Sequence, residues 1–256
     1  MRMRSSAISS PLQGTWRGLD VAIKRVIFQV LGDPVADARR KTALREAAIN
    51  GTMHHPNIVT TYAHDMQPLA QANMLGQAAR IAPFADWQLF IIQEYCDGGT
   101  LHTAIQEQRF WDKEAGQPLL PQILAIASDI AAGCAYIHSK QIIHGDLKPD
   151  NVLLKLKPGT ATAGGAPEGV ASAGGADSSA PAFTAKVADF GMSIRMSGNR
   201  THVSGVHQGT PLYIAPEILQ DGHASWASDA YSFGVSAAVH QCGVQGCILW
   251  LEVLVS

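Results

Sequence analysis

The chain of 256 residues has room for one large domain or two lobes. Its 46% hydrophobic content, with glycine and proline spread throughout, is typical of a globular protein rather than a disordered one. A formal net charge of -2 gives no general attraction to nucleic acid or to an anionic membrane, so an anionic ligand must be held by a local site. The four cysteines show no zinc or redox spacing, which favours buried thiols in a reducing, cytoplasmic compartment over a disulfide framework.

The two ends of the chain give weak targeting signals. Residues 1–11 carry arginines and serines without an acid, which faintly resembles an organelle transit peptide, although a misplaced chain start is the favoured interpretation. The apolar run 247–255 is much shorter than the roughly 20 residues of a membrane-spanning helix. No transmembrane segment is therefore expected.

The first predicted elements form a small antiparallel sheet with one helix. Residues 20–30 are rich in Val, Ile and Phe, and glycines punctuate the approach to them, which predicts a strand pair with Lys24 in mid-strand. The composition of residues 37–52 favours a helix that contains Glu46. The stretch 62–87 is interpreted as a loop insertion with room for a short helix.

The chain continues with a third strand-like run, 87–95, which ends at a glycine pair. Apolar residues then recur every three to four positions over 119–138, the spacing of a helix with one buried face. The stretch 159–182 is almost all Gly, Ala, Ser, Thr and Pro, too poor in apolar bulk to pack, and predicts a flexible insert between two strands.

Four short motifs carry the chemistry. They are Val21-Ala22-Ile23-Lys24, His144-Gly145-Asp146-Leu147-Lys148 with Asn151, Asp189-Phe190-Gly191, and Ala215-Pro216-Glu217. Any one of them is weak evidence, but together and in this order they resemble the signature set of the protein kinases. The run Gly14-Thr15-Trp16-Arg17-Gly18 resembles the tyrosine-kinase-like group, whose members are mostly serine/threonine enzymes.

The resemblance implies an α+β fold of two lobes. A small antiparallel β lobe with one helix would span 12–95, and a mainly helical lobe would span 96–256. Residues 1–256 would then form a partial protein kinase domain without its last helices. ATP would bind in the cleft between the lobes.

Phosphoryl transfer needs positioned cations and a base that orients the acceptor hydroxyl, because negative charge spreads over the migrating group. By resemblance, Lys24 contacts the α- and β-phosphates of ATP, and Glu46 holds the Lys24 ammonium in place. Taken alone, Lys24 would be interpreted as an ordinary strand lysine and Glu46 as a solvated helical glutamate. Their shared register favours the ion pair.

The catalytic loop supplies the remaining expected groups. Asp146 would accept or orient the proton of the substrate hydroxyl, and Lys148 would neutralise the γ-phosphate. Asn151 and Asp189 would hold Mg²⁺, which prefers hard oxygen ligands. Loop residues of these types are more often turn-formers and solvated charges, and the ordered set of motifs reverses that preference.

The resemblance also implies an adenine site. Backbone groups of a hinge would bind the base, a gatekeeper side chain would precede the hinge, and two apolar residues would form the walls. These residues are Glu94, Tyr95 and Cys96 for the hinge, Gln93 for the gatekeeper, and Ala22 and Leu153 for the walls. The walls would also belong to the core.

Substrate class follows from two details of the resemblance. Lys148 stands two residues after Asp146, and Gly209-Thr210-Pro211 is followed by Tyr213, as in serine/threonine kinases. The expected partners are ATP and proteins with serine or threonine acceptors, with neither nucleic acid nor a membrane, and the oligomeric state stays open.

The sequence also departs from the kinase pattern. No Gly-x-Gly-x-x-Gly run precedes Val21, and the later C-lobe helices are expected to be missing, so Glu217 is expected to lack its usual arginine partner. Gly145 stands where many kinases carry an arginine that binds a phosphate on the activation segment. Activity is therefore expected not to require phosphorylation at Thr201 or Ser204. The alternative is a catalytically inactive fragment or pseudokinase that acts as a binding module.

Overall fold

The computed structural model divides the chain into two compact units. Unit 1 comprises residues 1–54 and 60–95, and unit 2 comprises residues 55–59 and 96–256. The structure describes part of each unit; the described residues are 12–28, 41, 44–45, 47–49, 51–68, 87–157, 183–196, 198 and 200–236.

Unit 1 begins with the predicted antiparallel strand pair. Strand β1 (Leu12–Trp16) pairs with β2 (Leu19–Phe28) across a two-residue turn at Arg17 and Gly18. The φ values of these two residues are 51° and 79°, and a type I′ turn needs positive φ at both central positions. Such a turn matches the natural twist of the strands, and it sets the register that places Lys24 in the middle of β2.

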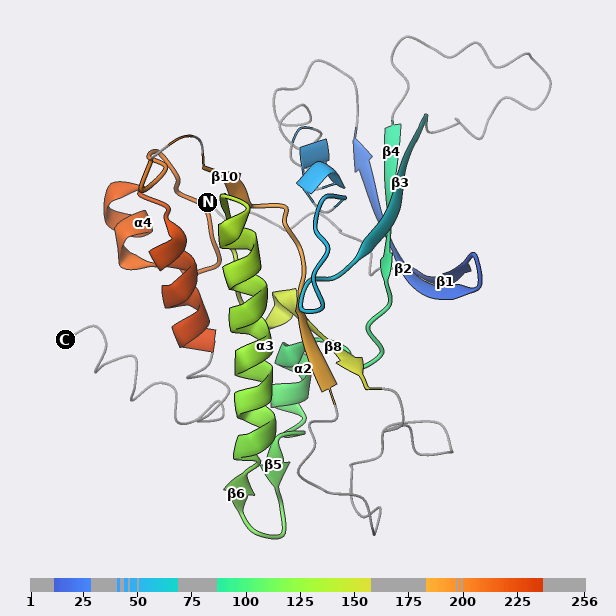
Figure 1. The fold of residues 1–256 in the computed structure, drawn as a ribbon, viewed down its shortest axis with the longest axis vertical. Coiled ribbons are helices and arrows are strands. Elements are labelled where there is room, and N and C mark those ends of the chain that lie inside the picture. Colours follow the sequence, from blue (N-terminus) through green and yellow to red (C-terminus); the bar gives the residue numbers. More distant parts are fainter. Residues whose placement is uncertain are drawn as a thin grey trace. The chain divides into compact units, whose positions relative to one another are not determined.

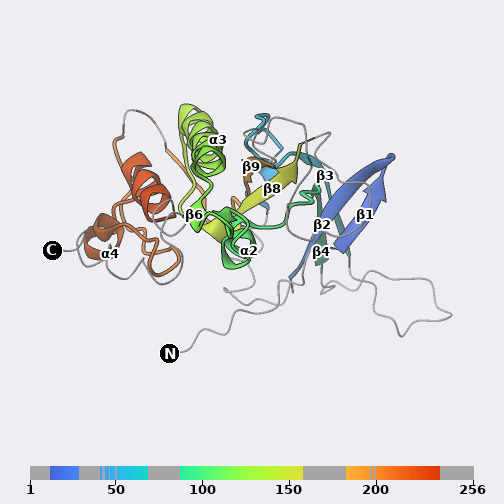
Figure 2. The same cartoon turned by 90° about the horizontal axis from the view of Figure 1, so that it is seen from below.

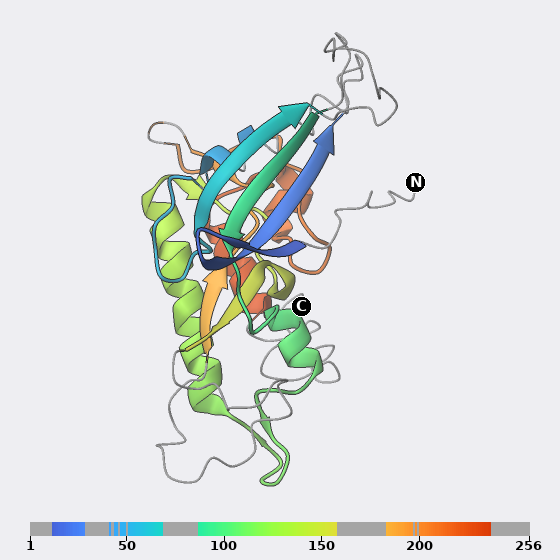
Figure 3. The ribbon, with the colours of Figure 1, turned by 90° about the vertical axis from the view of Figure 1, so that its right-hand side faces the viewer.

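Two further strands complete a four-stranded sheet in the order β1-β2-β4-β3. Strand β4 (Trp87–Glu94) confirms the predicted run and lies in the centre of the sheet, and Figure 3 shows the strands side by side. The interpretation of 62–87 as a loop was wrong at its start, because β3 (Thr61–Pro68) pairs with β4. Residues 64–67 of this edge strand are all exposed and, apart from Met66, polar, so backbone pairing forms it without an apolar pattern.

The helix predicted over 37–52 is confirmed in part, and it ends before the predicted boundary because residues 51–52 form a turn. Residues 44–45 and 47–49 are helical, and Ala47 packs against Leu89 and Ile91 of β4. This contact lays the helix on the sheet. Glu46 itself lies outside the described residues.

Unit 2 is organised around the predicted long helix, α3 (Leu120–Ser139). Its buried residues include Ile123, Ile130, Cys134 and Ile137, which confirms the expected apolar face. Within the described part of the chain, α3 is the helix long and apolar enough to cross a membrane by length and composition alone. The core helix of a folded domain has the same properties, and α3 lies against β9 and β7.

The remaining elements of unit 2 are short, and Figures 1 and 2 show α4 on one side of α3 and α2 and β8 on the other. Residues 226–236 form a further helix. The labelled elements are α2 (Leu101–Gln106), β5 (Trp111–Asp112), β6 (Gln117–Pro118), β7 (Ile142–Ile143), η1 (Pro149–Asn151), β8 (Val152–Leu156), β9 (Phe183–Val187), β10 (Ile194–Arg195) and α4 (Pro216–Asp221).

Strands β8 and β9 pair in an antiparallel ladder from Val152↔Val187 to Leu156↔Phe183. The stretch predicted as a flexible insert, 159–182, connects them and lies outside the described residues. The ladder brings the end of the catalytic loop close in space to the Asp189-Phe190-Gly191 motif, because each motif adjoins one of the two strands.

The segment 55–59 joins unit 2 rather than the small sheet that surrounds it in sequence. The backbone N–H of Val59 donates to the carbonyl of Val187 at 2.9 Å, and the Val187 N–H donates to Asn57 at 2.8 Å. The Asn57 side chain also donates to the Ala185 carbonyl at 3.0 Å. Strand β9 thus gains a partner on its second edge.

Candidate active site

The catalytic loop lies between β7 and η1, and its central group is the carboxylate of Asp146. Oδ2 of Asp146 accepts a hydrogen bond from Nζ of Lys148 at 2.8 Å, and Oδ1 accepts one from the hydroxyl of Thr210 at 2.6 Å. Nζ of Lys148 also donates to the Thr210 hydroxyl at 2.6 Å. The side chains of Lys148 and Asp146 are 19% and 9% exposed, so the pair is shielded from water but still accessible. A small, open hollow lined by Gly145, Asp146 and Thr210 borders this group.

Asn151 and Asp189 offer the oxygen atoms that a magnesium ion requires. The amide nitrogen of Asn151 donates to the carbonyl and to Oδ2 of Asp146, at 2.8 and 3.1 Å, so the amide oxygen remains the atom that would face a cation. Asp189 has a φ of 63°, an uncommon backbone conformation that is concentrated at functional sites. Mg²⁺ commonly takes only one or two protein ligands, so this pair fits the ion.

His144 is fully buried and links the catalytic loop to the segment that precedes Asp189. Its Nε2 lies 3.0 Å from the carbonyl of Ala188, and its Nδ1 accepts the backbone N–H of Asp146 at 3.3 Å. A carbonyl only accepts and an N–H only donates, so these partners assign a neutral ring with its proton on Nε2. The ring also packs against that of Phe190, with centroids 5.3 Å apart.

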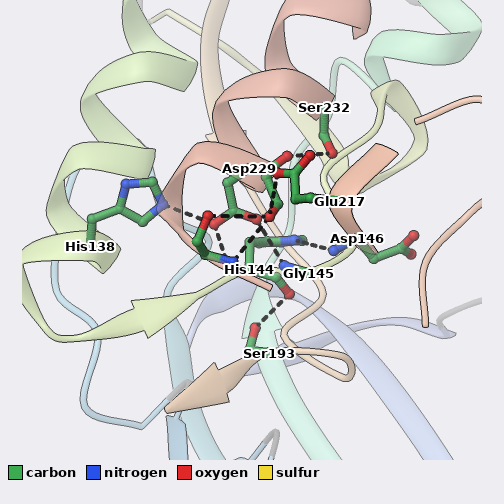
Figure 4. Close-up of polar contacts among 10 residues, drawn as sticks. His138, His144, Gly145, Asp146, Ser193, Glu217, Asp229 and Ser232 are labelled. Carbon is green, nitrogen blue, oxygen red and sulfur yellow. Dashed lines mark hydrogen bonds and ion pairs between the residues drawn. The ribbon is translucent and has the colours of Figure 1, made fainter. Parts of the chain in front are cut away.

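Asp229, on the helix over residues 226–236, fixes the backbone of the catalytic loop (Figure 4). Its Oδ2 accepts the N–H of His144 at 2.8 Å, and its Oδ1 accepts the N–H of Gly145 at 2.9 Å. Nε2 of His138 lies 2.8 Å from the same Oδ2. The carboxylate is 2% exposed, and these three donors compensate for its removal from water.

The charge of Asp229 also acts on the neighbouring core. Burial, with a further contribution from Asp229, raises the pKa of the Cys134 thiol from 9.0 to about 12. The thiol is therefore protonated and unreactive at neutral pH. Cys134 and Cys96 are both buried and free, as their spacing predicted.

Lys24 lies in unit 1, half-buried in mid-strand and opposite Ile91 of β4. The predicted pairing of Lys24 with Glu46 concerns a residue outside the described part of the chain. That ion pair therefore stays a prediction.

Two other predicted adenine-site residues face each other in the same sheet. Ala22 of β2 is the register partner of Gln93 of β4, and Nε2 of Gln93 donates to the hydroxyl of Thr61 at 3.1 Å. Glu94 ends β4, and its N–H donates to the carbonyl of Thr60 at 2.8 Å. The Gln93 amide is thus held in place by the edge strand that the sequence did not predict, and its gatekeeper role stays a prediction.

The rest of the predicted adenine site belongs to the chain that follows. Unit 1 ends at Tyr95, which is half-buried, and Cys96 begins the second segment of unit 2. Cys96 is buried in an apolar cluster with Val59 and Ala188, and Leu153 of β8 packs against this cluster. Leu153 and Cys96 thus meet in space, although 57 positions separate them in the sequence.

Within the described residues, Glu217 has a serine hydroxyl as a partner, and the expectation about its usual arginine stays a prediction. The hydroxyl of Ser228 donates to Oε1 of Glu217 at 3.0 Å, and the same hydroxyl accepts the N–H of Ser225. The turn between α4 and the next helix brings Ser228 back over Glu217. A neutral donor satisfies the carboxylate from within the described chain.

Sequence reasoning did not assign site roles to Thr210 and Asp229. Thr210 was noted only as a marker of substrate class, and Asp229 was not singled out. Both contact the catalytic loop from far along the chain, 64 positions from Asp146 for Thr210 and 85 from His144 for Asp229. Their positions within the kinase-like motifs were the available signal.

Comparison with known proteins agrees with this geometry. The family model described as "Protein kinase domain" matches residues 13–246. Serine/threonine-protein kinase CTR1 of Arabidopsis thaliana is 31% identical over 224 residues, which cover 86% of this chain and 21% of that protein. Wall-associated receptor kinase-like 21 of the same plant is 35% identical over 200 residues, 75% of this chain and 24% of that protein.

A human protein also matches. Serine/threonine-protein kinase ULK1 of Homo sapiens is 28% identical over 225 residues, 88% of this chain and 17% of ULK1. The chain thus spans about a fifth of the length of these three relatives. Because the family model covers most of its length, the chain belongs to the protein kinase domain family.

Proposed function

We propose that this chain is a serine/threonine protein kinase, which transfers the γ-phosphoryl group of ATP to a serine or threonine hydroxyl of a protein substrate. One observation carries the proposal: the Asp146 carboxylate, the Lys148 ammonium and the Thr210 hydroxyl all contact one another, at 2.6 to 2.8 Å. This places a base and a cation side by side in a partly shielded site.

Each member of this group has one task in the transfer. The acceptor hydroxyl oxygen forms a bond to the γ-phosphorus as the bond from that phosphorus to the ADP oxygen breaks. Asp146 accepts or orients the hydroxyl proton, and Lys148 offsets negative charge on the transferred group. Thr210 contacts both side chains and so orients them relative to each other.

The family implies ATP and a magnesium ion as the partners of these residues. A bound magnesium ion would neutralise phosphate charge and orient the phosphate oxygens. Asn151 and Asp189 would hold it through their side-chain oxygens. Lys24 would bind the α- and β-phosphates, a role that rests on family resemblance.

Two observations support serine and threonine as acceptors. The relatives reported above carry serine/threonine kinase names in CTR1 and ULK1. The Lys148–Thr210 contact also gives a structural reason for the two sequence details that resemble serine/threonine kinases.

The proposal is tested by incubating the full chain with Mg-ATP and three random peptide pools that have serine, threonine or tyrosine fixed at the centre. Transfer is expected to the serine and threonine pools. Asp146→Asn should lower the rate by about 100- to 10,000-fold, the usual contribution of a general base. Asp150→Asn is the matched control, because Asp150 lies in the same loop with its side chain 52% exposed and should leave the rate unchanged.

A rate that Asp146→Asn does not lower would contradict the proposal, as would transfer to tyrosine alone. If the chain transfers no phosphate to any pool, the alternative of a binding module gains support. A thermal shift with Mg-ATP, compared with Lys24→Met, would then show whether that module binds nucleotide.

A further inference from the structure

Ser193 follows the Asp189-Phe190-Gly191 motif by two positions and points into the catalytic loop. Its side chain is fully buried, and its hydroxyl donates to the carbonyl oxygen of His144 at 3.1 Å. Its own N–H donates to the carbonyl of Phe190 at 3.1 Å. Figure 4 shows the Ser193 side chain directed at the loop from the side opposite Asp229.

These contacts hold the His144–Gly145 backbone from two directions. The Asp229 carboxylate takes the N–H groups of His144 and Gly145, while Ser193 supplies the donor for the His144 carbonyl. Buried backbone groups need such partners, because an unsatisfied one is costly. Asp146 is the next residue along this fixed backbone.

Gly145 is what allows the two segments to lie this close. Its φ is 78°, in the left-handed region, and a Cβ atom there would lie 2.8 Å from the carbonyl oxygen of Met192. The obstacle is backbone rather than a flexible side chain, so a larger residue would push Met192 and Ser193 away from the loop.

We propose that Ser193 is a positioning residue for phosphoryl transfer: through the His144 carbonyl it sets the orientation of Asp146, and Gly145 makes this contact possible. The link uses a hydroxyl and a backbone carbonyl, so it needs no phosphate on the segment that carries Ser193. This inference rests on the proposed function, whose reaction Asp146 serves.

The competing reading is that Ser193 only satisfies its own hydroxyl in the core. Ser236 provides a matched control, because it is also buried, at 3% exposed, and its hydroxyl donates to the backbone carbonyl of Ser232 at 2.8 Å. Ser236→Ala therefore loses the same kind of bond without touching the catalytic loop. A purely structural role predicts similar effects of the two alanine variants.

The test compares phosphatase-treated wild-type chain, Ser193→Ala and Ser236→Ala. For Ser193→Ala we expect kcat to fall about 5- to 10-fold, the effect of one hydrogen bond, with the KM for ATP unchanged. Ser193→Thr, which keeps the hydroxyl, should recover most of the rate. Hydrogen exchange of the amides in 142–148 should quicken in Ser193→Ala and remain at the wild-type rate in Ser236→Ala.

Two results would overturn the inference. One is a Ser193→Ala kcat within twofold of an active wild type, and the other is unchanged exchange in 142–148. If the wild type transfers no phosphate, the proposed function fails by itself. The exchange measurement then still decides whether Ser193 holds the loop.

Discussion

Replacing Thr210 by valine removes one hydroxyl from the catalytic group and keeps the shape of the side chain. The hydroxyl donates to Asp146 at 2.6 Å and accepts from Lys148 at 2.6 Å, so both of its partners are charged. Hydrogen bonds to charged groups contribute about 1.5–3 kcal/mol. Since about 1.4 kcal/mol corresponds to a tenfold change in rate, kcat should fall about 10- to 150-fold.

The assay is steady-state phosphate transfer with ATP and the peptide varied in turn. The KM for ATP should change little, because Thr210 orients the base and the cation and has no assigned contact with the nucleotide. Thr210→Ser keeps the hydroxyl and should retain a rate close to that of the wild type. A valine variant with normal kcat would refute the reasoning, and so would a serine variant as slow as the valine one.

Two further predictions concern regulation and stability. Replacing Thr201 and Ser204 together by alanine should leave the transfer rate within about twofold of the wild-type rate, because Gly145 offers no cationic side chain to a phosphate. Both residues are exposed, and exposed substitutions usually have small effects. Complete loss of activity would contradict this. The raised pKa of Cys134, about 12 against 9.0, makes the folded chain hold the thiol proton more tightly than the unfolded chain, so stability present below pH 9 is lost as the pH rises toward 12. By about pH 10.5 the loss in the free energy of unfolding should reach about 2 kcal/mol. Urea unfolding at pH 8 and at pH 10.5 measures this loss, which should be smaller in Cys134→Ala than in the wild type. An equal loss in both proteins would contradict the argument.

The elements with a strong apolar period could be predicted from the sequence, and the weakly patterned ones could not. Helix α3 shows its buried face as a spacing of three to four residues. The centre of β4 is predicted as a strand because it is an apolar run, in which Leu89 and Ile91 bury one face. Strand β3 shows no such pattern, because residues 64–67 in its second half are exposed. Only its backbone pairing with β4 defines it as a strand.

The candidate site divides in the same way. The roles proposed for Asp146 and Lys148 could be read from one short motif, because the two residues are neighbours in the sequence. Their contacts with Thr210 join residues 62 and 64 positions apart, and the spacing of residues within a motif does not show that the chain returns to the loop there. The Ser228 hydroxyl that donates to Glu217 was not foreseen for a related reason, because it comes from the next helix and no motif links the two residues.

The assignment of residues 55–59 to unit 2 bears on how the protein could be dissected. A cut between residues 95 and 96 follows the main boundary between the two units. It would also separate Ile58 and Val59 from strand β9, which covers them. Both are almost completely buried, at 0% and 2% exposed, so the smaller piece would carry newly exposed apolar surface. The larger piece would keep β9 with one edge unpaired, and an unpaired strand edge promotes aggregation because it can pair with another chain. The segment 55–59 and strand β9 thus cover each other, and the cut would put them on different pieces. A protein split at residue 95 should therefore be poorly soluble unless both pieces are produced together.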